Sequence, residues 1–249
     1  MLELKDLTVA YPHSAPVLNG ISLTLTPGIT AVIGRNGVGK STLLHTLLGE
    51  IPYAGELLID GKSAATLTAR ERAKFLSLLP QMLPAPALTV RECIALGFSP
   101  SVTRLSDKEW QRVVKIEESL SLTHLDARRV YTLSGGERQR VFFGLALAQN
   151  TPVLLLDEPT AHIDLAFLAS FRSILQALRD EGKCVLTVLH DLNTALQWAD
   201  RILLLEEGKI AFDGTPAACI EARIPEWHFS LTHYTATDQN GAPVHFYAP

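Results

Sequence analysis

The chain has 249 residues, enough for one large domain with a substantial core or for two small domains. Its formal net charge of −4 argues against a nucleic-acid-binding protein, which usually carries a basic patch or stripe. The mean hydropathy of +0.17 could suggest a membrane protein, but no run of about 18 uncharged apolar residues occurs, so we expect no membrane-spanning helix.

The N-terminal segment and the cysteines both indicate a cytosolic protein. Residues 1–6 alternate in charge and lack the apolar stretch of a signal peptide. The cysteines Cys93, Cys184 and Cys219 are scattered, odd in number and without C-x-x-C spacing. We therefore expect reduced thiols in the core, and neither a disulfide framework nor a zinc site.

The first third of the chain is predicted to form strands and one helix. Residues 2–9 and 21–25 alternate apolar and polar side chains, as half-buried strands do. Residues 29–33 form an apolar run typical of a buried parallel strand, and a helix is predicted at 41–48. A second short β unit at 55–61 ends in an Asp-Gly turn.

A glycine-rich loop, residues 34–41 with the sequence GRNGVGKS, joins the buried strand to the helix. It matches the phosphate-binding pattern G-x-x-x-x-G-K-[ST] in the strand–loop–helix context that this pattern requires. Backbone N–H groups of such a loop converge on phosphate oxygens, and the helix N-terminus adds partial positive charge. Lys40 is expected to reach the β- and γ-phosphates, and Ser41 to offer its hydroxyl to Mg²⁺. The nucleotide-binding residues predicted here are Gly34, Asn36, Gly37, Gly39, Lys40, Ser41 and Thr42.

The stretch 84–150 differs in character from the segments around it. Two prolines separate its start from what precedes, and Thr89 and Glu92 could form a capping box at a helix start. Apolar residues recur at helical spacing in 107–120, and 135–149 is predicted as another helix. We interpret the stretch as a helical insertion in an α/β core.

Residues 153–157 then predict a buried strand that ends in two carboxylates, Asp157 and Glu158. Asp157 is expected to hold Mg²⁺, through water, because Mg²⁺ keeps most of its hydration shell. Glu158 can orient and activate the attacking water. Taken alone, the pair could equally be two exposed acids after a core strand. Beside the phosphate loop the magnesium interpretation is favoured, since adjacent carboxylates are costly unless a cation offsets them.

The rest of the core follows the same alternation of helix and strand. A helix is predicted at 165–180, a strand at 184–189, a helix at 192–199 and a hairpin at 201–212. The tail from Ala218 is mixed and matches no motif. No internal repeat or low-complexity segment is present.

Residues 133–141, LSGGERQRV, open the helix at 135–149. Ser134 is a good N-cap, and Gly135 and Gly136 leave the helix N-terminus open to an anion. A capped helix after a loop is the simpler interpretation of this tripeptide alone. One phosphate-binding helix end suffices for nucleotide affinity, however, and this would be a second.

With the phosphate loop and the LSGGE segment in this order, the chain resembles the ATPase subunit of an ATP-binding-cassette (ABC) transporter. The resemblance implies an α/β fold, a P-loop ABC ATPase core with an antiparallel β subdomain and an inserted α-helical subdomain. It covers residue 2 to about residue 216. We therefore expect an ABC ATPase domain at 1–220, its helical subdomain at about 84–150, and a C-terminal extension of unknown role at 221–249.

The resemblance also assigns roles to residues that carry little signal alone. Tyr11 matches the aromatic residue that stacks on adenine, and Gln81 the glutamine that contacts Mg²⁺ and the attacking water. Asp164, in the segment 161–164, matches the aspartate loop that crosses the dimer interface. His190 matches the histidine that senses the γ-phosphate.

The site implied by the resemblance is shared between two copies of the chain. In this family the Ser134–Gly136 segment faces the phosphate loop of the opposite subunit, so that two ATP molecules are sandwiched in a head-to-tail dimer. The expected catalytic residues are Glu158, His190 and Gln81, and the expected Mg²⁺ contacts are Ser41, Gln81 and Asp157. The remaining nucleotide contacts implied are Tyr11, Ser134, Gly135, Gly136 and Asp164.

Two positions depart from the family pattern. Ile163 stands where the usual residue before the aspartate is leucine. Leu145-Ala146-Leu147 stands where many relatives have Arg-Ala-Leu, so we expect the loss of a local salt bridge and not of nucleotide binding.

The function implied is ATP hydrolysis that drives transport through a separate membrane permease. The segments 89–92, 95–97, 190–193 and 199–201 are similar to those of the branch that imports iron siderophores, haem and cobalamin. The expected partners are polytopic permease chains, a second copy of the chain and, indirectly, an external substrate-binding protein, but no nucleic acid. The expected location is the cytoplasmic face of the inner (plasma) membrane, as a peripheral protein.

Two alternatives remain open at this point. An ATPase of a metal-ion importer or of a split exporter would keep every catalytic residue. A non-transport ABC ATPase that acts on ribosomes or DNA would usually carry two cassettes or a long coiled coil, and this sequence has one cassette and no sustained heptads. The substrate cannot be named from the sequence, because a cytosolic ATPase need never touch it.

Overall fold

The computed structural model describes residues 1–98, 105–161, 163–237 and 243–249. The strands and helices in chain order are β1 (Leu2–Ala10), β2 (Pro16–Leu25), β3 (Gly28–Ile33), α1 (Lys40–Leu48), β4 (Ala54–Ile59), β5 (Lys62–Ser63), α2 (Ala69–Arg72), β6 (Leu76–Leu79), α3 (Val90–Ala95), α4 (Asp107–Ser119), α5 (Gly135–Gln149), β7 (Val153–Asp157), α6 (Leu165–Asp180), β8 (Cys184–Val188), α7 (Leu192–Trp198), β9 (Arg201–Glu206), β10 (Lys209–Gly214), α8 (Pro216–Glu221), α9 (Ile224–Phe229), β11 (Thr232–Thr237) and β12 (Pro243–Ala248). Short 3-10 helices lie at Ala64–Thr66, Thr123–Leu125 and Val130–Thr132.

A six-stranded sheet in the order β10-β9-β3-β8-β7-β6 forms the centre of the molecule. All its neighbours pair in parallel except β10, which returns antiparallel to β9. The strands β7 and β8 are buried at every position, which explains their uninterrupted apolar sequences. Parallel strands place their carboxyl ends at one edge of the sheet, so β3, β7 and β8 deliver the residues that follow them to the same place.

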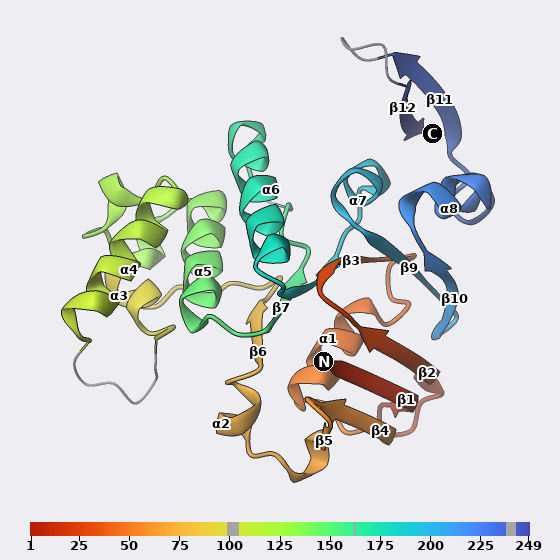
Figure 1. Cartoon of the computed structure of the whole chain (residues 1–249), viewed down its shortest axis with the longest axis horizontal. Coiled ribbons are helices and arrows are strands. Elements are labelled where there is room, and N and C mark those ends of the chain that lie inside the picture. Colours follow the sequence, from red (N-terminus) through yellow and green to blue (C-terminus); the bar gives the residue numbers. More distant parts are fainter. Residues whose placement is uncertain (99–104, 162, 238–242) are drawn as a thin grey trace.

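A second, antiparallel sheet in the order β2-β1-β4-β5 packs on one face of the central sheet, with α1 between them (Figure 1). The alternating pattern predicted for residues 2–9 is confirmed on either side of an irregularity at Lys5 and Asp6, which are both exposed. Leu2 and Leu4 are buried before it, and Leu7 and Val9 after it. One apolar cluster joins the two sheets and α1. Its buried members include Leu4, Leu7, Leu43, Leu44, Leu57, Leu155, Leu186 and Leu203.

The other face of the central sheet is covered by α5, α6 and α7 (Figure 1). Phe143 of α5 and Phe171 of α6 meet with ring centroids 4.5 Å apart and lie over the apolar side chains of β7. Aromatic pairs of this kind add packing energy beyond the area that they bury. The sheet is thus enclosed on both faces, as a largely parallel sheet requires.

Helices α3, α4 and α5 lie together to one side, between β6 and β7 in the chain (Figure 1). The predicted capping box at Thr89 and Glu92 is confirmed at the start of α3. The guanidinium of Arg91 binds the carboxylates of Glu117 and Asp126 at 2.8 Å and 2.7 Å, and the Glu117 side chain is completely buried. The buried acid is therefore paired, which ties α3 to α4 and to the segment after it.

The tail forms elements for which the sequence showed no motif. Helices α8 and α9 pack on the core, and β11 and β12 form an antiparallel hairpin. The Asn193 side chain at the start of α7 accepts a hydrogen bond from Tyr247 N at 2.8 Å and donates one to Tyr247 O at 3.0 Å. One amide side chain therefore holds the last strand against α7.

All three cysteines are free and buried, in agreement with the sequence prediction. Burial raises the pKa of the Cys93 thiol to about 11 and, with a smaller contribution from Glu226, that of Cys219 to about 11. Burial also raises the pKa of Cys184. Within the described ranges, no helix is long and apolar enough to cross a lipid bilayer.

Candidate active site

The loop between β3 and α1 takes a shape that two of its glycines make possible. Gly34 has a φ of 150°, and a Cβ there would lie 2.4 Å from the carbonyl oxygen of Leu205. Gly39 caps α1 with a φ of 108°, and its Cβ would lie 2.8 Å from Leu18. Any other residue at either position would strain the backbone and collide with the neighbouring strands.

Lys40 is held inside this loop. Its side chain is nearly buried, and Nζ donates to the carbonyl oxygens of Gly34 at 2.8 Å and Arg35 at 2.9 Å. Burial lowers the pKa of Lys40, while the nearby carboxylates Glu158 and Asp157 act in the opposite direction. The ammonium group is thereby aimed along the loop, where phosphate oxygens would bind.

Asp157 ends β7 opposite the start of α1. It is only 2% exposed, and its Oδ1 accepts a hydrogen bond from the Ser41 hydroxyl at 3.1 Å. Burial raises the pKa of Asp157 above its ordinary value; the Ser41 hydrogen bond lowers it, and the Glu158 charge raises it further. A buried carboxylate and a hydroxyl, both oxygen ligands, are thus already adjacent.

Glu158 follows in a strained backbone conformation. Its φ is 50°, in the left-handed region that residues with side chains seldom occupy. Its backbone N–H donates to the carbonyl oxygen of Val188 at 3.2 Å, and its Oε1 lies 2.6 Å from Nε2 of His190. Strain of this kind persists only where surrounding contacts fix it, and it gathers at functional sites.

A cavity of about 380 Å³ lies at the carboxyl edge of the sheet and is lined by most of these groups, although not by Gly34 or Asp157. It is lined by Asn36, Gly37, Gly39, Lys40, Ser41, Thr42, Gln81, Glu158 and His190. All of these residues were predicted from the sequence as nucleotide, metal or catalytic contacts. Tyr11 lies next to them, with its hydroxyl 3.4 Å from Thr42 Oγ1 and its side chain 45% exposed, free to stack on a ring.

The remaining predicted residues do not line this cavity. Ser134 caps α5 in a capping box with Glu137, and Gly135 and Gly136 form the first turn of the helix. Asp164 caps α6, accepting a hydrogen bond from Phe167 N at 2.8 Å. In the segment 161–164, residue 162 lies outside the described residues.

Gln139 is a residue of the site that sequence reasoning missed. It is 2% exposed on α5, and its Nε2 donates to the carbonyl oxygens of Pro159 at 2.7 Å and Glu158 at 3.3 Å. The available signal was an amide side chain three positions after the Gly-Gly pair, on a helix otherwise rich in apolar residues.

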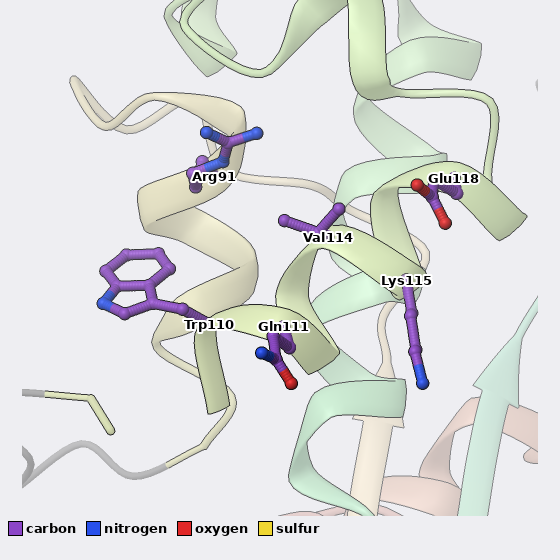
Figure 2. Close-up of a pocket in the computed structure, with 6 residues that line it drawn as sticks. All are labelled: Arg91, Trp110, Gln111, Val114, Lys115 and Glu118. Atoms are coloured by element: carbon purple, nitrogen blue, oxygen red, sulfur yellow. The ribbon is translucent and has the colours of Figure 1, made fainter. Parts of the chain in front are cut away.

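A larger cavity of about 620 Å³ lies between α3 and α4. Figure 2 shows that Arg91 comes from α3, whereas Trp110 and Val114 come from α4 together with the remaining lining residues. The lining residues are Arg91, Trp110, Gln111, Val114, Lys115 and Glu118. The Trp110 side chain is partly exposed, and none of the predicted catalytic residues takes part.

The comparisons with known proteins agree with this geometry. The sequence profile of the ABC transporter family matches residues 18–161. The ferric enterobactin transport ATP-binding protein of Escherichia coli (strain K12) is 36% identical over 237 residues, which cover 92% of this chain and 87% of that protein. The hemin import ATP-binding protein of Pseudomonas fluorescens is 41% identical over 229 residues, covering 88% and 89%.

A solved structure of a dimeric ATP-binding cassette, in a post-hydrolysis state bound to ADP and Pi, superposes with a TM-score of 0.79. It is 27% identical and covers 87% of this chain and 99% of its own. The family profile spans more than half of the chain, the relatives span most of it, and the phosphate loop and acidic strand end meet in one cavity. The chain therefore belongs to the ABC transporter family, as an ATP-binding ATPase subunit with the P-loop ABC ATPase fold.

Proposed function

We propose that the chain is the ATP-hydrolysing subunit of an importer that takes up an iron chelate, haem or cobalamin through a separate membrane permease. The observation that carries the proposal is the cavity that brings the phosphate loop, Glu158 and His190 together. The relatives named for ferric enterobactin and hemin favour iron chelates and haem among the three substrates.

The residues of the cavity divide the reaction between binding and activation. The loop N–H groups and Lys40 bind the β- and γ-phosphates, and Tyr11 stacks on the adenine. Glu158 accepts a proton from the attacking water. His190, 2.6 Å from that carboxylate, holds it in place and faces the γ-phosphate. Positioning and charge stabilisation supply most of the catalysis in phosphoryl transfer to water.

The donor set also fits Mg²⁺. Ser41 and Asp157 present adjacent oxygens, and Gln81 lines the same cavity. A buried carboxylate with a raised pKa gains most from a nearby cation. Across the described residues, no three His, Cys, Asp or Glu side chains form a metal cage, which suits an ion that binds through one or two carboxylates, water and phosphates. When bound, Mg²⁺ neutralises charge on the phosphates.

The active form is a head-to-tail homodimer with two composite sites. Ser134, Gly135, Gly136 and Asp164 lie outside the cavity of their own chain, which supports a role in the site of the partner. The N-terminus of α5 then offers its backbone N–H groups and partial positive charge to the γ-phosphate bound by the other copy.

The permease contacts the helical insertion. The cavity between α3 and α4, with its partly exposed Trp110, is large enough to receive side chains of a short cytoplasmic helix. Gln81 lines the nucleotide cavity and not this one. The two are connected through residues 82–89, which lead from Gln81 into α3. In this proposal the chain lies at the cytoplasmic face of the inner membrane, as a peripheral protein.

The domain division is part of the same proposal. Residues 1–220 form the ATPase domain, with the helical subdomain at about 84–150, and residues 221–249 form an extension. Ile224 and Tyr247 of the extension belong to one apolar cluster with Ile33 and Leu204 of the central sheet, which supports an extension that is packed on the domain.

The proposal is tested with Glu158→Gln, which keeps the shape of the side chain and removes its basicity. The purified variant should bind ATP as the wild type does and lose nearly all steady-state hydrolysis, measured as released phosphate. In cells that lack the gene, the wild-type allele should restore uptake of labelled ferric siderophore or haem, and the variant should not. Wild-type hydrolysis by the variant would refute the catalytic role. A defect confined to a bare metal ion or an exported lipid would refute the substrate class.

A further inference from the structure

Gln139 lies in the second turn of α5, five residues after the helix cap Ser134. Its side chain is 2% exposed, and it is the one polar residue among the buried residues of α5. Its Oε1 is buried and has no hydrogen-bond partner in the described part of the chain. A buried acceptor without a partner destabilises the fold. The presence of an amide at this position is therefore explained by the hydrogen bonds that its nitrogen donates.

The nitrogen of this amide binds the chain directly after β7. Nε2 donates to Pro159 O at 2.7 Å and to Glu158 O at 3.3 Å. Two carbonyl oxygens around one terminal atom fix its identity as the nitrogen, because a flipped amide would set three oxygens against one another. The contact thus joins the helix that begins with the LSGGE segment to the backbone of the predicted base.

That backbone is the strained part of the site. Glu158 has a φ of 50°. Its N–H donates to Val188 O at 3.2 Å, and its carbonyl oxygen accepts a hydrogen bond from Ala161 N at 3.2 Å as well as the one from Gln139. A conformation that costs free energy by itself needs several contacts to be held, and the amide of Gln139 supplies two of them.

We propose that Gln139 is a positioning residue for ATP hydrolysis, which fixes the Glu158–Pro159 backbone and thereby the carboxylate that activates water. This rests on the catalytic role proposed for Glu158. Because Gln139 belongs to α5, it also makes the position of the Glu158 backbone depend on the position of that helix. Gln139 is not among the residues that line the nucleotide cavity, so we assign it a positioning role and no direct contact with the reacting groups.

The test is Gln139→Met, which keeps an unbranched side chain of similar length and removes both donated hydrogen bonds. Gln149→Met on the exposed end of the same helix is the matched control. Gln139→His is a second variant, because its Nε2 restores a donor at about the same reach. Steady-state ATP hydrolysis, ATP affinity and Tm are measured for each, beside wild type and Glu158→Gln.

For Gln139→Met we expect kcat to fall at least about tenfold, since small misplacements of a catalytic group have large effects on rate. KM and ATP affinity should stay at wild-type values, Gln139→His should lie between Met and wild type, and Gln149→Met should match wild type. A wild-type kcat in Gln139→Met overturns the proposal, and so does a loss of kcat and ATP affinity together. Equal losses in folded Met and His variants overturn it too.

The experiment distinguishes a failure of the role proposed for Gln139 from a failure of the role proposed for Glu158. If Gln139→Met does not fold, the other two variants decide. A wild-type kcat in Gln139→Leu overturns the proposal. A Gln139→His variant that folds and binds ATP but is as inactive as Glu158→Gln also overturns it. Full activity in Glu158→Gln would instead overturn the base assignment, and this inference with it.

Discussion

Asp157 illustrates how a single residue of the site is favourable for binding and unfavourable for folding. It is buried, and its partners are one hydroxyl and a neighbouring carboxylate of the same charge. Burial raises its pKa, so the folded state holds the proton more tightly than the unfolded chain does. Ionised Asp157 is thus a cost of folding that a bound cation relieves.

We predict that Asp157→Asn stabilises the nucleotide-free protein near neutral pH. A raised folded pKa means that stability falls as pH rises from the ordinary value of 3.8 through the folded value, so the full penalty is present at neutral pH. Each kcal/mol relieved should raise Tm by about 2–4 °C in a chain of this size. Mg²⁺ with ATP should raise the Tm of the wild type more than that of the variant. Asp60→Asn, at an exposed turn where the side chain lies 3.9 Å from the N-terminal amine, should change Tm little, because exposed ion pairs contribute little stability. A lower Tm for Asp157→Asn near neutral pH would contradict the assignment.

The residues of the nucleotide cavity could be predicted because linear motifs carry their own geometry. A glycine-rich loop between a buried strand and a helix already fixes where Lys40 and Ser41 point. The role of Gln139 could not be predicted from its one local signal, an amide on a largely apolar helix, because nothing in the sequence says which side of α5 faces the end of β7. Its role depends on how a helix of the insertion packs against the core.

At the scale of elements, the packing of α3 against α5 depends on close backbone contact. A Cβ on Gly97 would lie 2.3 Å from Leu145 O and 2.7 Å from the Cβ of Ala148. Leu145 itself is partly buried and packs on the apolar cluster of the insertion. The absence of a Cβ at Gly97 thus allows the end of α3 to approach α5 closely.

Gly97→Ala is predicted to lower the free energy of unfolding by about 1–3 kcal/mol, because the end of α3 must move away from α5. Urea denaturation followed by circular dichroism measures the change as a lower midpoint. Leu96→Ala, at the exposed neighbouring position, should shift the free energy by less than about 0.5 kcal/mol. Equal stability of Gly97→Ala and the wild type would show that the two helices can separate without cost.

Elements with a clear apolar pattern were predictable, and elements of mixed composition were not. Helix α6 is long enough to show a helical period, and the buried strands β3, β7 and β8 are apolar runs. Helices α8 and α9 have six residues each, too few for a periodic signal, and the β11–β12 hairpin presents mixed side chains on both strands. Their structure comes from packing on α7 and the central sheet, which local sequence does not encode.

At the scale of the whole molecule, the two helix ends that we propose to bind phosphate do not open on the same cavity of one chain. The N-terminus of α1 opens on the nucleotide cavity, and that of α5 does not line it. A dimer with twofold symmetry makes two equivalent composite sites from such a chain. The family could be predicted because every motif occurs in the expected order. The substrate could not, since no residue of the ATPase need touch it.

Composite sites predict complementation between inactive chains. Lys40→Ala removes the phosphate contact, and Ser134→Arg blocks the helix end, so each variant alone should hydrolyse no ATP. Mixed dimers retain one intact site, and random pairing should restore up to about a quarter of the wild-type rate. Differently tagged chains, mixed and assayed for phosphate release, measure this. Absence of activity in mixtures whose mixed dimers are demonstrated by pull-down would exclude the shared site.

The buried thiols have a practical consequence for following that dimer in motion. With pKa values of about 11, Cys93 and Cys219 are almost wholly protonated at neutral pH and are shielded from reagents. Cys184 is buried as well. The three native cysteines should therefore not react with maleimide reagents in the folded protein. A cysteine introduced at an exposed position, such as Leu165 beside the aspartate loop, would carry a fluorophore or spin label without first replacing any native residue.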